Sequence, residues 1–141
     1  MTTLDAAPSP AAHPAPTYSI AETAARTGLT PHTLRYYERD GLMLHDVGRS
    51  VSGHRRYTAQ DLHWIELINR LRSTGMPIRE IRRYADLVRA GSGNETERLA
   101  LLRGHRQQVL SQLTQVQEHL GAIDRKIGIY LDRLEQQELG G

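Results

Sequence analysis

Residues 18–42 decide the fold and read YSIAETAARTGLTPHTLRYYERDGL. Ser19 and Glu22 have the three-residue spacing of a capping box, which starts a helix by satisfying its first free N–H groups. Small alanine side chains follow on one face, and Gly28 ends the helix. The stretch therefore begins with a short helix that a neighbour can approach closely.

A second short helix follows after a tight turn. Thr30 supplies an N-cap and Pro31 a first-turn proline, while Asp40-Gly41 ends the helix. Leu34 and Tyr37 lie on its inner side at i, i+3 spacing. Two such helices in succession are typical of a DNA-reading helix-turn-helix, whose second helix enters the major groove. The residues predicted to face DNA from this helix are His32, Thr33, Arg35, Tyr36 and Arg39.

The next segment, residues 44–57, reads as two short strands around a turn that contains Gly53. Three arginines gather in it, and cations on a hairpin beside a recognition helix suit the phosphate backbone of DNA. The hairpin residues predicted to contact DNA are Arg49, His54, Arg55, Arg56 and Tyr57.

Two further helices follow, one capped by Thr58 and ending near Gly75, the other running from Pro77 to Ala90. Apolar residues then recur at alternating intervals of three and four, over about five heptads, with only Arg106 polar. A helix of this length, roughly 60 Å, needs a partner of matching length, which we expect to be a second copy of the chain. The predicted dimerisation residues are Leu99, Leu102, Val109, Leu113, Val116, Leu120, Ile123 and Ile127.

These patterns predict a mainly α fold: a helix-turn-helix with a two-stranded hairpin, followed by a long helix that forms a coiled coil. Periodicity alone leaves the parallel or antiparallel direction of that coil open. The predicted segments are a Pro- and Ala-rich disordered tail at 1–17, the DNA-binding domain at 18–91, the coiled-coil helix at 94–134 and a short tail at 135–141.

Composition narrows the function classes. The net charge is only +2, but residues 18–90 carry twelve Arg against eight Asp and Glu, so the basic excess lies on the helix-turn-helix segment. The chain has no cysteine, which excludes disulfides and zinc–thiolate sites. No apolar run is long enough for a membrane span and no signal peptide is recognisable, so we expect a cytoplasmic protein.

Catalytic signals are missing. The sequence has no cysteine nucleophile or phosphate loop, and its carboxylates read as helix-surface groups. His105 and His119 are roughly 21 Å apart along one helix, and His45 with His54 lacks a carboxylate ligand for a metal. We therefore expect no enzyme, no metal and no cofactor.

Three motifs together resemble the MerR family of bacterial transcription regulators: SIAETAARTGLT, LRYYERDGL and RSVSGHRRY. The resemblance continues through Asp61-Leu62, Leu71-Arg72 and residues 75–78 and covers residues 18 to about 134. It implies a winged helix-turn-helix DNA-binding domain, with the hairpin as first wing and residues 77–90 as second, and a homodimer joined by antiparallel coils. It also implies binding to a pseudo-palindromic promoter site, which the activated dimer distorts so that RNA polymerase holoenzyme can engage.

Carried onto this chain, the resemblance implies that Thr33, Arg35 and Tyr36 contact bases or phosphate. Arg49, Arg55 and Tyr57 would hold phosphates from the wing. His54 departs from the family, where many members have tyrosine.

The signal that this regulator would sense is open. Metal- and redox-sensing relatives use cysteines, which this chain lacks. The run from Trp64 to Ile78 most resembles the short subgroup linked to aldehyde and electrophile stress, some of whose members have a cysteine near the position of Arg70. A non-covalent small-molecule effector remains open, and Trp64, Tyr84 and Tyr130 could line its pocket or be ordinary core and interface aromatics.

Two other readings of the sequence remain. Within DNA binding, the chain could be a repressor or an architectural protein of the same fold that needs no effector. In a different class, it could be a coiled-coil adaptor whose winged helix contacts another protein. The twelve arginines of residues 18–90 argue against the adaptor, and the sequence does not choose between activator and repressor.

Overall fold

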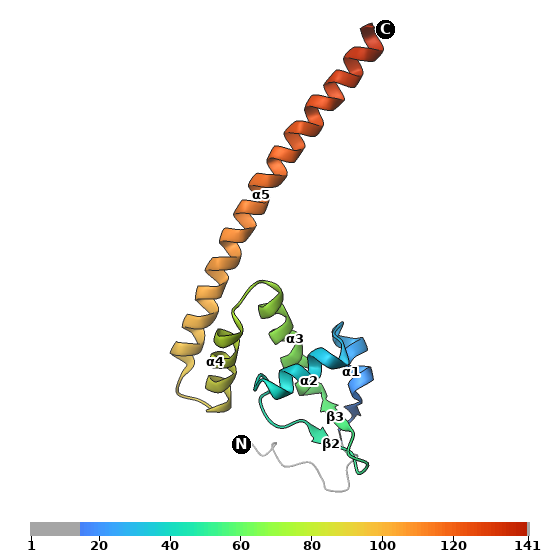
Figure 1. Ribbon diagram of the computed structural model, residues 1–141. Coiled ribbons are helices and arrows are strands. Elements are labelled where there is room, and N and C mark those ends of the chain that lie inside the picture. Colours follow the sequence, from blue (N-terminus) through green and yellow to red (C-terminus); the bar gives the residue numbers. More distant parts are fainter. Residues whose placement is uncertain (1–14, 141) are drawn as a thin grey trace, which may run out of the picture. The chain divides into compact units, whose positions relative to one another are not determined.

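The computed structural model describes residues 15–140 and is mainly α (Figure 1). The chain divides into two compact units, one ending at Ser92 and the other beginning at Gly93, and each is described by itself. The elements in chain order are β1 Thr17–Tyr18, α1 Ile20–Thr27, α2 Pro31–Arg39, β2 Gly48–Arg49, β3 Arg55–Thr58, α3 Ala59–Ser73, α4 Ile78–Arg89 and α5 Glu95–Gly140. The mainly helical prediction is confirmed.

The caps of α1 and α2 form as the sequence predicts. Ser19 Oγ accepts a 3.0 Å bond from the Glu22 amide, and Glu22 Oε1 accepts a 2.8 Å bond from the Ser19 amide. Hydrogen bonding from Ser19 to the carboxylate, above all from its backbone amide, lowers the pKa of Glu22. Gly28 takes the left-handed conformation, with φ of 73°, and ends α1. Thr30 Oγ1 accepts from the Thr33 amide at the start of α2.

A three-stranded antiparallel sheet has the order β1-β3-β2. The predicted hairpin is its β2–β3 part, where Arg49 is paired with Arg55. The third strand is new: β1 pairs Thr17 with Thr58 and Tyr18 with Tyr57. Thr17 therefore belongs to the sheet and not to the predicted disordered tail, whose residues 1–14 lie outside the described part.

The core of the first unit is built from side chains of α1, α2, α3, α4 and β3. Its most buried apolar side chains, each at most 1% exposed, are Leu34, Tyr37, Leu42, Tyr57, Ile65, Ile68, Ile81 and Ala85. Leu34 and Tyr37 confirm the predicted inner side of α2. Of the α1 alanines expected on one face, Ala24 is buried but Ala25 is exposed, and Thr23 is buried beside Ala24.

Two arginines of α4 hold the end of α2. Arg82 Nη2 lies 2.5 Å from Asp40 Oδ2, and its Nε donates to the Asp40 carbonyl at 3.1 Å. Arg89 donates to the carbonyl oxygens of Gly41 and Met43 and pairs with Asp86. These bonds satisfy backbone carbonyl oxygens of the loop that follows α2, and they fix that loop.

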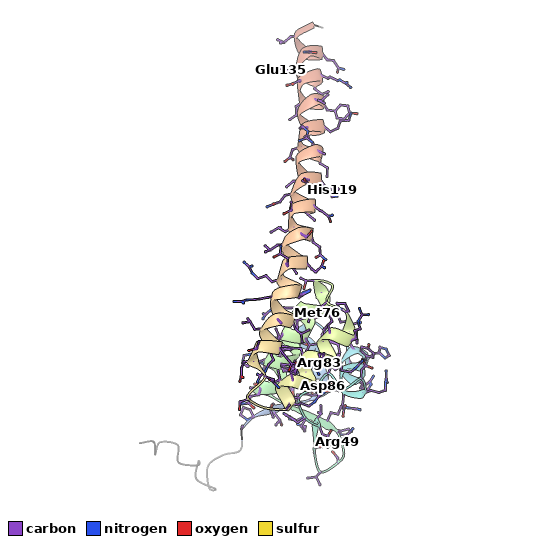
Figure 2. All side chains as sticks on the ribbon, turned by 90° about the vertical axis from the view of Figure 1, so that its left-hand side faces the viewer. Arg49, Met76, Arg83, Asp86, His119 and Glu135 are labelled. Atoms are coloured by element: carbon purple, nitrogen blue, oxygen red, sulfur yellow. The ribbon has the colours of Figure 1, made fainter. Side chains whose placement is uncertain are left out.

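The second unit is α5, a single helix of 46 residues. Figure 2 shows its side chains projecting along its length, past the labelled His119 and Glu135. The helix continues through Gly140, so the tail predicted at 135–141 is wrong for residues 135–140. These residues contain no proline and are mostly good helix formers, which explains why the helix does not end at Leu134.

The predicted dimerisation residues form an apolar seam on α5. Leu113, Val116, Leu120, Ile123 and Ile127 are each at least 50% exposed in the single chain. Leu99 is also exposed, whereas Leu102 and Val109 are half-buried. Among the helices in residues 15–140, none is both long and apolar enough to cross a membrane.

Candidate nucleic-acid interface

The second helix, α2, presents a polar face opposite its buried one. His32, Arg35 and Arg39 are exposed, and Thr33 and Tyr36 are half-buried. Within residues 15–140, Arg35 and Arg39 have no hydrogen-bond or ion-pair partner, so their guanidinium groups can bind a ligand without first breaking a contact. This is the face that the sequence predicted.

An open groove of about 640 Å³ joins this face to the hairpin and the start of α1. Four of its lining residues are arginines and none is acidic, so we refer to it as the cationic groove. Polar groups of Ser19, Ser50 and Ser52 add hydrogen-bonding capacity. The arginines of the groove are Arg35, Arg49, Arg55 and Arg56. A concave surface with this charge suits a phosphate backbone, since each neutralised phosphate adds affinity.

The hairpin tip is ordered by its own hydrogen bonds. Ser52 Oγ lies 3.0 Å from Ser50 Oγ and 3.1 Å from His54 Nδ1, and the Ser50 amide donates to the His54 carbonyl. Arg49, labelled in Figure 2, donates to the Gly53 carbonyl at 3.2 Å. His54 is exposed and lines the cationic groove, as a DNA-facing residue would.

Not all of the predicted arginines are equally free. Arg55 Nε lies 2.5 Å from Glu38 Oε1, and Arg49 Nη2 lies 3.8 Å from Glu38 Oε2. Arg56 donates to both Oγ1 and the carbonyl of Thr17, each at 3.0 Å, and so ties β3 to β1. Arg55 and Arg56 are therefore engaged by Glu38 and Thr17 within the chain. Arg35 and Arg39 make no such hydrogen bond or ion pair in the described residues.

Tyr57 is a core residue and is withdrawn from the DNA-facing set. Its side chain is 1% exposed, because its place in β3 points it toward the inner face of the sheet. Burial raises the pKa of its phenol, and the nearby Glu38 carboxylate raises it further. The alternation of side chains along a strand was the signal for this placement: Arg56 and Tyr57 are neighbours and must point to opposite faces.

Tyr36 makes a cation–π contact with Arg72, a contact that the sequence analysis did not predict. The guanidinium of Arg72 lies 5.5 Å from the centre of the Tyr36 ring and 5.8 Å from that of Tyr37. A cation over an aromatic ring is attracted by the ring's quadrupole. Arg72 thus links α3 to α2 and contacts Tyr36 at the edge of the polar face of α2.

The three aromatics predicted to line an effector pocket divide between the two units. Trp64 and Tyr84 stack with ring centres 5.8 Å apart, and Trp64 is only 9% exposed. Tyr130 lies on α5, is 51% exposed and has Lys126 and Arg133 near its ring. The stacking accounts for Trp64 and Tyr84 as packed aromatics, and an effector pocket stays a prediction.

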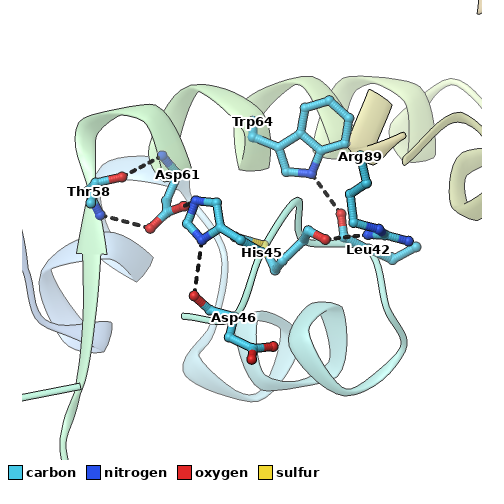
Figure 3. Close-up of polar contacts among 8 residues, drawn as sticks. Leu42, His45, Asp46, Thr58, Asp61, Trp64 and Arg89 are labelled. Atoms are coloured by element: carbon cyan, nitrogen blue, oxygen red, sulfur yellow. Dashed lines mark hydrogen bonds and ion pairs between the residues drawn. The ribbon is translucent and has the colours of Figure 1, made fainter. Parts of the chain in front are cut away.

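Within residues 15–140, histidine and carboxylate groups form capping contacts and assemble no metal site. His45 Nε2 lies 3.3 Å from Oδ1 of the buried Asp61, whose other oxygen accepts from the Thr58 amide at 2.9 Å (Figure 3). This arrangement caps α3. In the described residues, no group of three or more His, Asp or Glu side chains could hold a metal ion.

With this geometry established, the chain can be compared with known proteins. The sequence model described as "MerR HTH family regulatory protein" matches residues 18–87, and the one described as "MerR, DNA binding" matches residues 62–126. An HTH-type transcriptional regulator of Haemophilus influenzae is 35% identical over 114 residues, which cover 81% of this chain and 84% of that protein. The chain belongs to the MerR family. It is thus a MerR-type helix-turn-helix transcription regulator.

Other MerR relatives agree with this assignment. The crystal structure of HiNmlR, a MerR family regulator lacking the sensor domain and bound to promoter DNA, superposes with a TM-score of 0.75 at 33% identity. The match covers 89% of this chain and 97% of HiNmlR. A MerR family regulator from Listeria monocytogenes gives a TM-score of 0.79 at 34% identity, covering 86% and 93%. AdhR of Bacillus subtilis is 39% identical over 92 residues, 65% of each chain.

Proposed function

We propose that two copies of this MerR-type regulator pair through the α5 seam and bind one pseudo-palindromic promoter site in the cytoplasm. The observation that carries the proposal is the cationic groove, in which the unpartnered Arg35 of α2 faces the same space as the arginines of the hairpin. Each half-site of the DNA would receive one α2 helix in its major groove and one hairpin against the backbone. The relative HiNmlR, bound to promoter DNA, supports this placement.

The exposed seam supports the homodimer part of the proposal. Five seam residues, each at least half exposed, follow one another along α5, and a contiguous apolar stripe of this kind marks an interaction surface. Because the seam repeats with coiled-coil spacing, a second copy of the same helix matches it in length and period. Two copies related by a twofold axis would read a palindromic site.

The proposed action is distortion of the promoter DNA, which would let RNA polymerase holoenzyme engage its two promoter elements. Bending or untwisting DNA costs several kcal/mol, roughly 1–6, and the phosphate contacts of two cationic grooves are the source of compensating energy. The regulator would be no enzyme and would need no cofactor. A small-molecule effector remains compatible with this action, and so does a repressor that uses the same contacts.

The test is DNase I footprinting of the purified protein on its own upstream promoter region, followed by transcription in vitro from the same fragment. A palindromic footprint with rising transcription supports activation by distortion; a footprint with falling transcription indicates a repressor. Binding that does not depend on DNA sequence indicates an architectural DNA-binding protein. Failure to bind any DNA would favour the coiled-coil adaptor that contacts another protein.

The assigned DNA face has its own test within that experiment. Arg35→Ala should weaken promoter binding by one to two orders of magnitude, about 1–3 kcal/mol, and leave the oligomeric state unchanged. Arg125→Ala removes the same charge from α5 and should bind like the wild type. Equal affinities for both variants at physiological salt would remove Arg35 from the interface.

A further inference from the structure

A single acidic residue lies on the helix that faces DNA. Of the nine residues of α2, only Glu38 carries a negative charge. It is half-buried, with 23% of its side chain exposed, and it lines a second hollow together with Asp46 and the three arginines Arg35, Arg39 and Arg55. A carboxylate here opposes phosphate binding by repulsion, so its presence needs another explanation.

The contacts of Glu38 give that explanation. Its Oε1 accepts from Arg55 of β3 at 2.5 Å, and its Oε2 faces Arg49 of β2 at 3.8 Å. One carboxylate thus reaches both strands of the hairpin from the last turn of α2. The Arg55 side chain is itself only 25% exposed, so this pair is shielded from solvent more than an ordinary surface ion pair.

We propose that Glu38 is a positioning and specificity-determining residue of the DNA interface. It holds the hairpin at a fixed placement relative to α2, and it occupies the Arg55 guanidinium so that this cation does not bind phosphate. The affinity for DNA then depends more on whether α2 and the hairpin fit the same DNA segment than on the total positive charge of the interface. The inference rests on the proposed DNA-binding function and changes the role predicted for Arg55, from phosphate contact to hairpin anchor.

Salt dependence separates the two roles of Arg55. Each arginine that neutralises a phosphate makes the slope of log K against log salt more negative by about 0.9. If Glu38 occupies Arg55, removal of the carboxylate frees that cation and the slope steepens. If Arg55 instead binds phosphate in the wild-type protein, substitution of Arg55 alone makes the slope shallower, although Glu38 is still present.

The experiment measures binding of the full chain to a duplex from its promoter region and to a scrambled duplex of equal length and composition. The variants are Glu38→Gln, Arg55→Gln and the double variant, and affinities are recorded between 50 and about 300 mM NaCl, the range in which phosphate contacts are strongly screened. Glu118→Gln on α5 changes the charge equally and serves as the control.

We expect Glu38→Gln to bind the scrambled duplex several-fold more tightly, with a slope steeper by about 0.9, and to lose part of its preference for promoter DNA. Arg55→Gln alone should leave the scrambled-duplex slope unchanged and weaken promoter binding. In the double variant, the steeper slope of Glu38→Gln should disappear. A gain in affinity cannot come from misfolding, because a misfolded protein loses binding to both duplexes.

Two results would overturn the inference: an unchanged slope and preference in Glu38→Gln, or a slope made shallower by Arg55→Gln in the presence of Glu38. A different result would contradict the proposed function: the wild-type protein would bind the promoter duplex and the scrambled duplex with equal affinity. In that case the scrambled-duplex slopes still test whether Glu38 occupies Arg55.

Discussion

The indole N–H of Trp64 donates a 2.7 Å hydrogen bond to the backbone carbonyl oxygen of Leu42 (Figure 3). Leu42 is fully buried and lies just after α2, while Trp64 lies on α3. The bond therefore satisfies a carbonyl in the core and fixes the chain where it leaves the recognition helix.

Trp64→Phe should lower the free energy of unfolding by about 1–3 kcal/mol, because the Leu42 carbonyl loses its partner while remaining buried. The measurement is urea unfolding followed by circular dichroism at fixed protein concentration. Tyr84→Phe keeps the ring that stacks on Trp64 and removes only a hydroxyl, so it should unfold near the wild-type midpoint. If both variants were equally stable, the hydrogen bond would contribute nothing measurable.

Arg82→Gln should destabilise the first unit by about 1 kcal/mol, because the ion pair with Asp40 and the bond to its carbonyl are both weakened. The pair is partly exposed, at 40% for Arg82 and 29% for Asp40, so added salt should reduce the difference. Arg79→Gln on the same helix is the matched control and should stay within roughly 0.5 kcal/mol of the wild type. The same loss in both variants would contradict a specific role for Arg82.

The capping box of α1 predicts a pH dependence. Hydrogen bonds from Ser19 lower the pKa of Glu22 below its ordinary value of 4.5, so the folded state binds the proton more weakly than the unfolded chain. The stabilisation is therefore fully present above pH 4.5 and is lost as the pH falls through the lower pKa of the folded state. Glu22→Gln should be less stable than the wild type at pH 6.5, with the difference shrinking in strong acid. Glu118→Gln should show no such convergence in urea unfolding across the same pH range.

The seam on α5 predicts the oligomeric state. Leu120→Glu places a charge where two apolar side chains would meet, and we expect the variant to be a monomer by light scattering at micromolar concentration. Gln115→Glu adds the same charge on the opposite side of the helix and should remain a dimer. A dimeric Leu120→Glu would show that the chain does not pair through this seam.

Arg106 is the one polar residue at a seam position, and such residues help to set coiled-coil register at a cost in stability. Arg106→Leu should raise the melting temperature of the dimer and admit additional oligomers. Thermal unfolding and light scattering test both effects. If neither quantity changed, Arg106 would have no part in the register.

Local signals in the sequence predicted most of this protein. The capping box of Ser19 and Glu22, the N-cap of Thr30 and the glycine end of α1 involve residues within a few positions of one another, so their geometry follows from short-range bonding. The heptad pattern likewise predicted one long helix, and residues 135–140 extend it because nothing in their composition stops it. The three sequence motifs of the first unit were sufficient to indicate the MerR family.

The tertiary structure decided which of the predicted side chains remain available to DNA. Arg55 pairs with Glu38 from 17 positions away, and Arg82 pairs with Asp40 from 42 positions away. Tyr57, predicted at the interface, turns into the core. The sequence by itself determined the elements and their caps, because these depend on neighbours along the chain. Only the folded chain decided the pairing of charges, because an ion pair depends on distance in space.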